Sequence, residues 1–420
     1  MSVVAQSFAT RPRTAVAPLR RPLADYPVRR PTVDEVVAAD RPEEPIHCLR
    51  PAAVAETARD FVRSFPGDVL YAVKCNPDPA VLRALWDGGV RHFDCASLPE
   101  VRLVRDMLPD AAIHFMHPIK ARGAIREAWA RHDVRDFVLD SADELAKIRT
   151  EITATEVPGP LGLIVRLALP KGGAMLDLSG KFGADADAAA DLLRAARGYA
   201  TTLGVSFHVG SQCLDPLAWR DALVLTGQVI RAAGVKVDIV DVGGGFPVAY
   251  PEQEPPALGA FFAEIEARFG TLGLADARLW AEPGRALVAA GTSVVVQVQA
   301  RRGAELYIND GVYGSLADAG TLGFRYPVRL IRPDGNAAVQ TTKFSLFGPT
   351  CDSADVMHGP FLLPADTAEG DWIEIGQLGA YGACLRTAFN GFDRARSVEV
   401  GDKPLPDTPT YAPDHLQAAA

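Results

Sequence analysis

The sequence has few cysteines, no long apolar run and no cluster typical of metal ligands. Its six cysteines are scattered over 420 residues without CxxC spacing, so we expect neither a zinc site nor another bound metal. Such cysteine usage is typical of a reducing cytoplasm. The longest uncharged apolar stretch, 286–300, is shorter than a bilayer span and rich in valine, which predicts a strand and no membrane helix.

An excess of basic residues is also lacking. The chain has 43 Lys and Arg against 52 Asp and Glu, and its formal net charge of -9 repels phosphate backbones and anionic membranes. We therefore expect neither nucleic acid nor a membrane as a partner. A P-loop signature is absent as well, so a nucleoside triphosphate is not indicated. The length is sufficient for an enzyme with a small-molecule substrate.

The first 24 residues contain no acidic side chain, which together with several arginines is typical of an organelle transit peptide. Five prolines argue against the amphipathic helix that such a peptide needs: Pro12, Pro18, Pro22, Pro27 and Pro31. We expect residues 1–44 to form an N-terminal arm that is partly mobile or docked on the C-terminal domain. The role of this arm stays open.

Short apolar runs alternate with helical patterns from about residue 65 to 285, as in repeated β-α units. Eight strands are predicted, over 68–74, 92–95, 112–115, 136–139, 161–169, 204–208, 237–242 and 278–282. Helices are predicted between them, over 80–86, 100–107, 123–131, 142–149, 185–200, 217–233 and 258–269. Eight strands in series predict an α/β TIM barrel, (β/α)8, over residues 45–285.

The pattern changes after Arg285 to valine-rich strands with Pro and Gly turns. Strands are predicted over 292–299, 305–309, 342–346 and 371–375. Residues 286–420 are therefore expected to form a second, mostly β domain.

Residues with reactive or charged side chains stand where the predicted barrel strands end, which is where TIM barrels carry their active sites. They are Lys74, Asp94, His208, the run Gly243-Gly244-Gly245, Glu282 and Arg285, and strand five carries Arg166. The interior of such a barrel is normally filled by branched apolar side chains. Charges gathered at one end of several strands thus predict an active site.

Each of these residues also has a simpler interpretation. Lys74 could be a surface lysine, but it follows the buried strand at the barrel mouth, where desolvation and nearby cations would lower its pKa and make it a nucleophile. Glu282 could pair with Arg285, or it could hold the proton on a pyridine nitrogen. His208 could be a packed core histidine, or it could stack on a flat cofactor.

The three glycines could form no more than a flexible turn. Loops after strands seven and eight of this fold commonly bind phosphate, however, and Arg285 adds a forked cationic donor. A Schiff-base lysine, a carboxylate, a stacking ring and a phosphate loop together predict pyridoxal 5'-phosphate as the cofactor.

Ordered motifs in both halves resemble those of one family, the alanine-racemase-fold (fold-type III) decarboxylases, the group that includes the eukaryotic-type ornithine decarboxylases. The motifs are Tyr71-Ala-Val-Lys-Cys-Asn76, Phe93-Asp-Cys-Ala-Ser97, Ser206-Phe-His-Val-Gly-Ser211, Asp241-Val-Gly-Gly-Gly-Phe-Pro247, Glu282-Pro-Gly-Arg285, Asn309-Asp-Gly-Val-Tyr-Gly-Ser315, Gly348-Pro-Thr-Cys-Asp-Ser-Ala-Asp355, Gly379-Ala-Tyr-Gly382 and Phe389-Asn-Gly-Phe392. The resemblance covers most of the chain beyond the N-terminal arm.

The resemblance implies a homodimer in which Tyr313, Cys351 and Asp352 enter the neighbouring subunit's site. It implies that Lys74 carries the cofactor as a Schiff base, that Cys351 donates a proton and that Asp352 binds the distal ammonium of the substrate. The remaining cofactor contacts that it implies come from Asp94, Arg166, His208, Ser211, Gly243, Gly244, Gly245, Glu282, Arg285 and Tyr381. The implied activity is decarboxylation of L-ornithine to putrescine, in polyamine biosynthesis, or of L-lysine to cadaverine.

The chain departs from the family pattern after Tyr313. Members that act on ornithine commonly have a further acid there, where this chain has Thr321 and Leu322, and only Asp318 is near enough to replace it. A different substrate stays open for this reason. Diaminopimelate decarboxylases usually have Cys-Glu-Ser in place of Cys351-Asp352-Ser353, and a racemase fits the second-domain motifs less well. A non-catalytic regulatory homologue and a Schiff-base aldolase are the alternatives of other classes.

Overall fold

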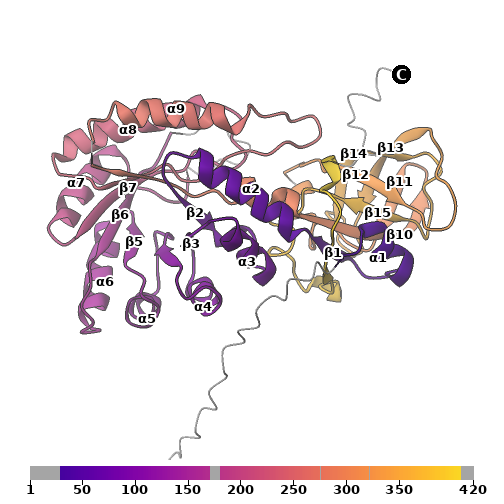
Figure 1. Ribbon diagram of the computed structural model, residues 1–420, viewed down its shortest axis with the longest axis horizontal. Coiled ribbons are helices and arrows are strands. Elements are labelled where there is room, and N and C mark those ends of the chain that lie inside the picture. The colour runs from indigo at the N-terminus through magenta and orange to yellow at the C-terminus, as the bar shows by residue number, and fades with distance from the viewer. Residues whose placement is uncertain (1–28, 171–179, 275, 321, 408–420) are drawn as a thin grey trace, which may run out of the picture.

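The computed structural model describes residues 29–170, 180–274, 276–320 and 322–407. Figure 1 shows a barrel and a sheet-rich domain side by side along the long axis of the molecule. None of the helices in the described ranges is long and apolar enough to cross a bilayer.

Eight parallel strands close into a barrel in chain order. They are β2 (Asp68–Ala72), β3 (His92–Cys95), β4 (Ala112–Phe115), β5 (Asp136–Leu139), β6 (Gly162–Arg166), β7 (Thr202–Ser206), β8 (Ile239–Asp241) and β9 (Arg278–Ala281). Each coincides with a predicted strand to within a few residues, and the predicted TIM barrel is confirmed. The strands were predictable because most of their residues are buried, so that they read as short segments rich in apolar residues.

Helices surround the barrel (Figure 1). They are α2 (Pro51–Ser64), α3 (Pro79–Asp87), α4 (Leu98–Met107), α5 (Arg122–His132), α6 (Ala142–Thr153), α7 (Ala186–Arg197), α8 (Leu217–Ala233) and α9 (Leu258–Gly270). Several begin at a residue whose side chain accepts a backbone N–H, as Ser97, Ser141 and Asp185 do. Only α2, before the first barrel strand, was not predicted.

The second domain is built on an eight-stranded sheet with the main order β12-β15-β10-β11-β13-β14. Its strands are β10 (Thr292–Arg302), β11 (Glu305–Ile308), β12 (Val328–Ile331), β13 (Thr341–Phe347), β14 (Val356–Pro364) and β15 (Trp372–Ile375), with β1 (Ile46–Leu49) and β16 (Arg396–Glu399) beside β10. The predicted β domain is thus confirmed. β1 precedes the barrel in sequence, yet it pairs antiparallel with β10 and parallel with β16.

Helix α1 (Val33–Asp40) lies on this sheet and begins with a capping box between Thr32 and Glu35. Its Val33 and Val37 are buried in one cluster with Val295 and Trp372. Residues 29–44 of the predicted arm therefore lie on the second domain, whereas residues 1–28 are outside the described part of the chain. The domain limits at residues 44 and 285 stay predictions.

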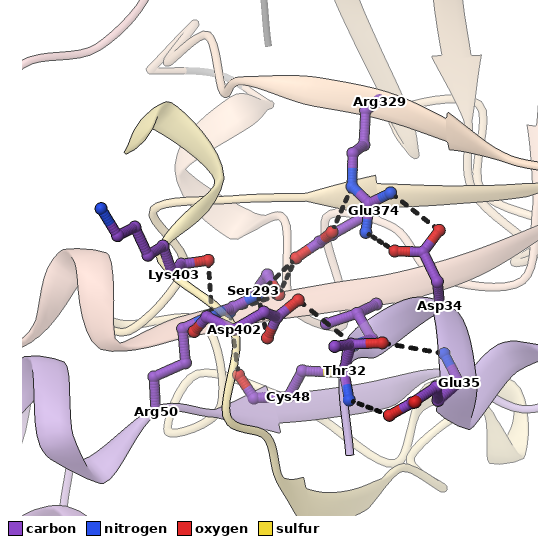
Figure 2. Close-up of polar contacts among 11 residues, drawn as sticks. Thr32, Asp34, Glu35, Cys48, Arg50, Ser293, Arg329, Glu374, Asp402 and Lys403 are labelled. Carbon is purple, nitrogen blue, oxygen red and sulfur yellow. Dashed lines mark hydrogen bonds and ion pairs between the residues drawn. The ribbon is translucent and has the colours of Figure 1, made fainter. Parts of the chain in front are cut away.

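A buried ion-pair cluster connects α1 and β1 to the sheet (Figure 2). Glu374 of β15 accepts from Arg50 Nη2 at 2.8 Å and from Arg329 Nε at 2.7 Å, and Arg329 also binds Asp34 of α1. The side chains of Arg50 and Glu374 are 2% and 1% exposed. Because buried charges are costly unless paired, this cluster determines how the start of the chain docks.

Candidate active site

Lys74 lies at the mouth of the barrel, in the 3-10 helix η1 (Val73–Cys75) that directly follows β2. Its Nζ is 3.8 Å from Asp94 Oδ2, and about half of its side-chain surface, 47%, is exposed. Burial acts to lower the pKa of the amine, but the carboxylates of Asp94 and Glu282 outweigh it, so the pKa is raised. The prediction of a lowered pKa is wrong because carboxylates, more than cations, surround the amine.

Two buried carboxylates, Asp94 and Glu282, act on this lysine from the ends of barrel strands, and a third, Asp241, lies next to Glu282. Burial raises the pKa of Asp94 to about 7, against the effect of Lys74, and raises the pKa of Asp241 to about 6. Burial and the neighbouring Asp241 raise the pKa of Glu282 to about 8. Glu282 Oε1 has no hydrogen-bond partner among the described residues. A buried carboxylate oxygen without a partner is costly, and a pyridinium N–H would satisfy it.

His208 follows β7 by two residues, and its Nδ1 accepts from the Gly210 N–H at 3.0 Å. Burial, with the nearby positive charges of Arg166 and Lys74, keeps the pKa of the imidazole far below its usual value. The ring is therefore neutral at pH 7, and a neutral flat ring is suited to stacking on a cofactor ring. Arg166 is the last residue of β6.

The Gly243-Gly244-Gly245 loop follows β8 and leaves no space for side chains. A Cβ on Gly243 would lie 2.1 Å from Phe207 O, and one on Gly245 would lie 2.2 Å from Gly210 O. Both residues have positive φ, 66° and 101°. On Gly244 a Cβ would lie 2.5 Å from Glu282 O and 3.2 Å from His208 Nε2. The partly buried Ser211 follows Gly210 on the facing loop. A loop without side chains lets a phosphate come close to the backbone N–H groups, which are suited to binding it.

Arg285 begins the short helix α10 (Arg285–Val288) after β9 and is 5% exposed. Its Nη1 donates to Tyr250 Oη at 2.8 Å and its Nη2 to Asp318 Oδ2 at 2.9 Å. The Tyr381 ring centroid is 5.2 Å from the guanidinium carbon, and the Tyr381 N–H donates to Cys75 O, next to Lys74. Arg285 thus pairs with Asp318 and not with Glu282.

This position of Asp318 corrects one sequence hypothesis. Asp318 was a candidate for binding the distal amine of the substrate, but its carboxylate is buried against Arg285. A carboxylate in a buried ion pair is not available to a second cation without loss of the first. Of the two residues at the place of the missing acid, Leu322 is partly exposed and Thr321 is outside the described residues.

A second group of predicted residues lies on two loops of the β domain. Tyr313 Oη donates a hydrogen bond to Asp352 Oδ2, and the Ala354 N–H and this hydroxyl lower the pKa of Asp352. Cys351 is exposed, and its backbone N–H donates to Asn390 Oδ1 at 3.1 Å. Within the described part of one chain, no hydrogen bond or ion pair joins Tyr313, Cys351 or Asp352 to Lys74.

The residues at the barrel mouth fit pyridoxal phosphate, because they combine a lysine amine, an unpartnered carboxylate oxygen, a neutral ring and a glycine cradle. Residues 52–289 match the pyridoxal binding domain of the pyridoxal-dependent decarboxylases. The chain belongs to this family. It is a pyridoxal-phosphate-dependent amino acid decarboxylase of the eukaryotic ornithine decarboxylase type.

Similar proteins cover most of this decarboxylase. A lysine/ornithine decarboxylase of Selenomonas ruminantium is 32% identical over 346 residues, which are 80% of this chain and 84% of that protein. Ornithine decarboxylase of Schizosaccharomyces pombe is 34% identical over 78% of this chain and 76% of its own. A lysine/ornithine decarboxylase of Vibrio vulnificus, solved with putrescine, is 29% identical with a TM-score of 0.74, over 88% of this chain and 99% of that one.

Several residues of the decarboxylase site were not found from the sequence. Tyr250 accepts a hydrogen bond from Arg285, and Asp241 accepts one from the Gly243 N–H. Asp355 connects the two β-domain loops, because its carboxylate accepts from Val312 N at 2.8 Å and from Thr350 Oγ1 at 2.7 Å. Asp241 and Asp355 belong to motifs that resemble those of the family, and their place in these motifs could have indicated them as site residues. Tyr250 stands outside any motif, and only the fold brings it to Arg285.

Proposed function

We propose that this decarboxylase acts on a basic L-amino acid, with L-ornithine as the first candidate and L-lysine as the second. The products would be putrescine and cadaverine, precursors in polyamine biosynthesis. The observation that carries the proposal is Asp352, an acid with a lowered pKa that Tyr313 holds beside the exposed Cys351. An ionised carboxylate at this place binds a distal ammonium by a charge-assisted hydrogen bond. Several similar proteins are named ornithine or lysine/ornithine decarboxylases.

The proposed cofactor site assigns one task to each group at the barrel mouth. Lys74 would bind the cofactor covalently and His208 would cover the ring. The ionised Glu282 carboxylate would accept from the protonated pyridine nitrogen, whose positive charge would counteract the burial that raises the pKa of this acid. The phosphate contacts would come from Ser211, Gly243, Gly244, Gly245, Arg285 and Tyr381. Asp94 and Arg166 would line the pocket near Lys74.

When bound, pyridoxal phosphate supplies an electron sink for the electron pair that the departing carbon dioxide leaves behind. The Cys351 thiol would donate a proton to the substrate α-carbon, and Asp352 would hold the far end of the substrate. The Tyr313 hydroxyl orients Asp352. The Lys74 amine, poised beside Asp94, would release the product from the site.

The same proposal includes a homodimer with shared active sites. Tyr313, Cys351 and Asp352 have no described contact with Lys74 of their own chain, which is what a site completed by a second copy requires. Beside Tyr313, whose ring centroid is 4.9 Å from that of Phe389, the side chains of Phe389 and Phe392 are 41% and 44% exposed. Exposed aromatic side chains at one place are suited to a subunit interface. Cytoplasmic location stays a prediction from the cysteines.

The first test is carbon dioxide release by the cofactor-loaded protein from ornithine, lysine, arginine and diaminopimelate, with Lys74→Ala as the inactive control. We expect release from ornithine or lysine. Preference for arginine or diaminopimelate would refute the proposed substrate. No release from any of them would favour a regulatory binding protein, and antizyme inhibitor 2 of Xenopus laevis, 32% identical over 80% of this chain, is a similar protein.

A mixing experiment tests the shared site. Lys74→Ala and Cys351→Ala should each be inactive, but subunit exchange between them would give mixed dimers with one intact site. Equal mixing should restore about a quarter of the wild-type activity, because half of the dimers are mixed and each has one of two sites. Absence of any recovery, with exchange shown by a tagged subunit, would exclude a site built from two chains.

A further inference from the structure

Asp318 lies in the 3-10 helix η3 (Ala317–Ala319) of the second domain and is 7% exposed. Its Oδ2 is 2.9 Å from Nη2 of Arg285, the first residue of α10, which begins shortly after the barrel strand β9. The ion pair therefore connects the β domain to the end of the barrel where the glycine loop lies. A contact at this place is well situated to influence how phosphate binds.

Protein groups already bind both outer nitrogens of Arg285. Tyr250 accepts from Nη1 at 2.8 Å and Asp318 accepts from Nη2. The ring centroids of Phe324 and Tyr381 lie 4.7 Å and 5.2 Å from the guanidinium carbon and exclude water from it. These contacts leave little freedom for rotation of the guanidinium group.

The third nitrogen of this guanidinium differs from the other two. Arg285 Nε is buried and has no hydrogen-bond partner among the described residues. A buried unpaired donor costs free energy that an acceptor on a ligand would offset. The acceptor of matching charge at this end of the barrel is the phosphate of the cofactor.

We propose that Asp318 is a positioning residue for the cofactor: it holds Arg285 so that the free edge of the guanidinium meets the phosphate. The inference rests on the proposed phosphate site. By this proposal the β domain contributes to the phosphate site of its own chain. It does so through Asp318, which does not itself contact the cofactor. It also assigns Asp318 a task other than the substrate role that was a hypothesis from the sequence.

A plain structural role gives a different expectation. If Asp318 only connected the two domains, its removal would weaken the binding of every barrel ligand equally, or it would lower only the stability of the protein. If it positions Arg285, the loss is restricted to ligands that carry the phosphate. Pyridoxal has the same ring and aldehyde as pyridoxal phosphate but no phosphate, so the pair of ligands separates these roles.

The test is titration of wild type, Asp318→Ala, Asp318→Asn and Arg285→Ala with pyridoxal phosphate and with pyridoxal, followed by cofactor absorbance and protein fluorescence without any amino acid. We expect Asp318→Ala to bind pyridoxal phosphate about tenfold or more weakly, because a hydrogen bond to a charged group contributes more to binding than a neutral one. Its affinity for pyridoxal should stay within about twofold of wild type, as for Arg285→Ala. Asp318→Asn keeps an acceptor oxygen and should lose less.

Asp366→Ala is the matched control, because Asp366 also accepts from an arginine of the β domain, Arg332, at 2.8 Å. It should leave both affinities unchanged. Tyr250→Phe removes another acceptor of Arg285, the hydroxyl 2.8 Å from Nη1, and provides a second variant if Asp318→Ala does not fold. It should weaken the binding of pyridoxal phosphate and leave the binding of pyridoxal unchanged. Unchanged affinity for pyridoxal phosphate, or equal loss of both ligands, would overturn the proposal. Wild type that binds the cofactor but decarboxylates no diamino acid refutes the proposed substrate alone.

Discussion

At the level of single residues, the barrel mouth gathers three acids whose pKa values burial has raised. Glu282, Asp94 and Asp241 are each 5% exposed or less. Protonated acids next to a lysine allow charge to be redistributed when a cofactor and a substrate enter. The same feature makes the stability of the cofactor-free protein depend on pH.

The pKa of Glu282 is about 8 in the folded protein, against 4.5 as its usual value. Between these values the folded chain holds a proton that the unfolded chain has lost, so stability is fully present at low pH and decreases as pH rises toward 8. Glu282→Gln should remove this contribution and flatten the decrease by up to about 1.4 kcal/mol per pH unit. Urea unfolding of the cofactor-free protein from pH 5 to pH 8 measures it. Parallel curves for wild type and variant would contradict the assignment.

Asp352 carries the substrate proposal at the same scale. Asp352→Asn keeps the size of the side chain and an acceptor for the Tyr313 hydroxyl, but it removes the charge that would pair with a distal ammonium. The KM for the preferred diamino acid should rise about tenfold or more. Steady-state kinetics measure this, and the cofactor absorbance should be unchanged. A KM equal to that of wild type would exclude Asp352 from substrate binding.

At the level of elements, the two loops of the β domain are held together by Asp355. Its carboxylate binds Val312 beside Tyr313 and Thr350 beside Cys351. A Cβ on Gly311 or on Gly348 would lie 2.1 Å from Asp355 Oδ1, so both loops approach it as closely as backbone allows. One buried acid therefore determines how the loop residues lie relative to each other.

Asp355→Ala should disturb the substrate end of the site and spare the barrel. Loss of the acceptors for Val312 N, Thr350 N and Thr350 Oγ1 should lower kcat/KM by about tenfold or more, since each buried donor left unpaired costs about 1–3 kcal/mol. Affinity for pyridoxal phosphate should remain that of wild type. Thr350→Val removes one of these hydrogen bonds and should have a smaller effect. Loss of cofactor binding in Asp355→Ala would show that the substrate end of the site and the cofactor site in the barrel are not separable.

At the level of the whole molecule, segments from both ends of the chain complete the β domain. Arg50 donates to Ser293 Oγ at 2.8 Å and to Lys403 O at 3.1 Å, besides its pair with Glu374 (Figure 2). Segments more than 240 residues apart in sequence thus share one buried cluster. The folded β domain therefore includes residues from the start of the chain, although the barrel lies between them in sequence.

Glu374→Gln leaves Arg50 buried without its charged partner. We expect a loss of about 3–5 kcal/mol in the free energy of unfolding, as for other broken buried ion pairs. The control is Asp60→Ala, which breaks the exposed pair with Arg63 and should cost less than about 1 kcal/mol. Urea unfolding of both variants provides the comparison. Equal losses would show that the cluster contributes no more than a surface pair.

The prediction from the sequence was most accurate where neighbouring residues decide the structure. Barrel strands such as 136–139 are buried after their first residue, and helices such as 142–153 begin at a side chain that caps them. The isolated strand β1 was missed because its four residues are stabilised by β10 and β16, both more than 240 residues away. Strand β12 was missed since three of its four residues are only partly buried.

The sequence by itself determined the barrel, the cofactor class and the residues at the strand ends, because apolar periodicity and side-chain chemistry are local properties. Only the tertiary structure decided the partner of Asp318, the raised pKa of Lys74 and the role of Asp355. Each of these depends on the distance between groups that are far apart in sequence. Electrostatic and hydrogen-bond energies decrease steeply with distance, so they are determined only when the chain has folded.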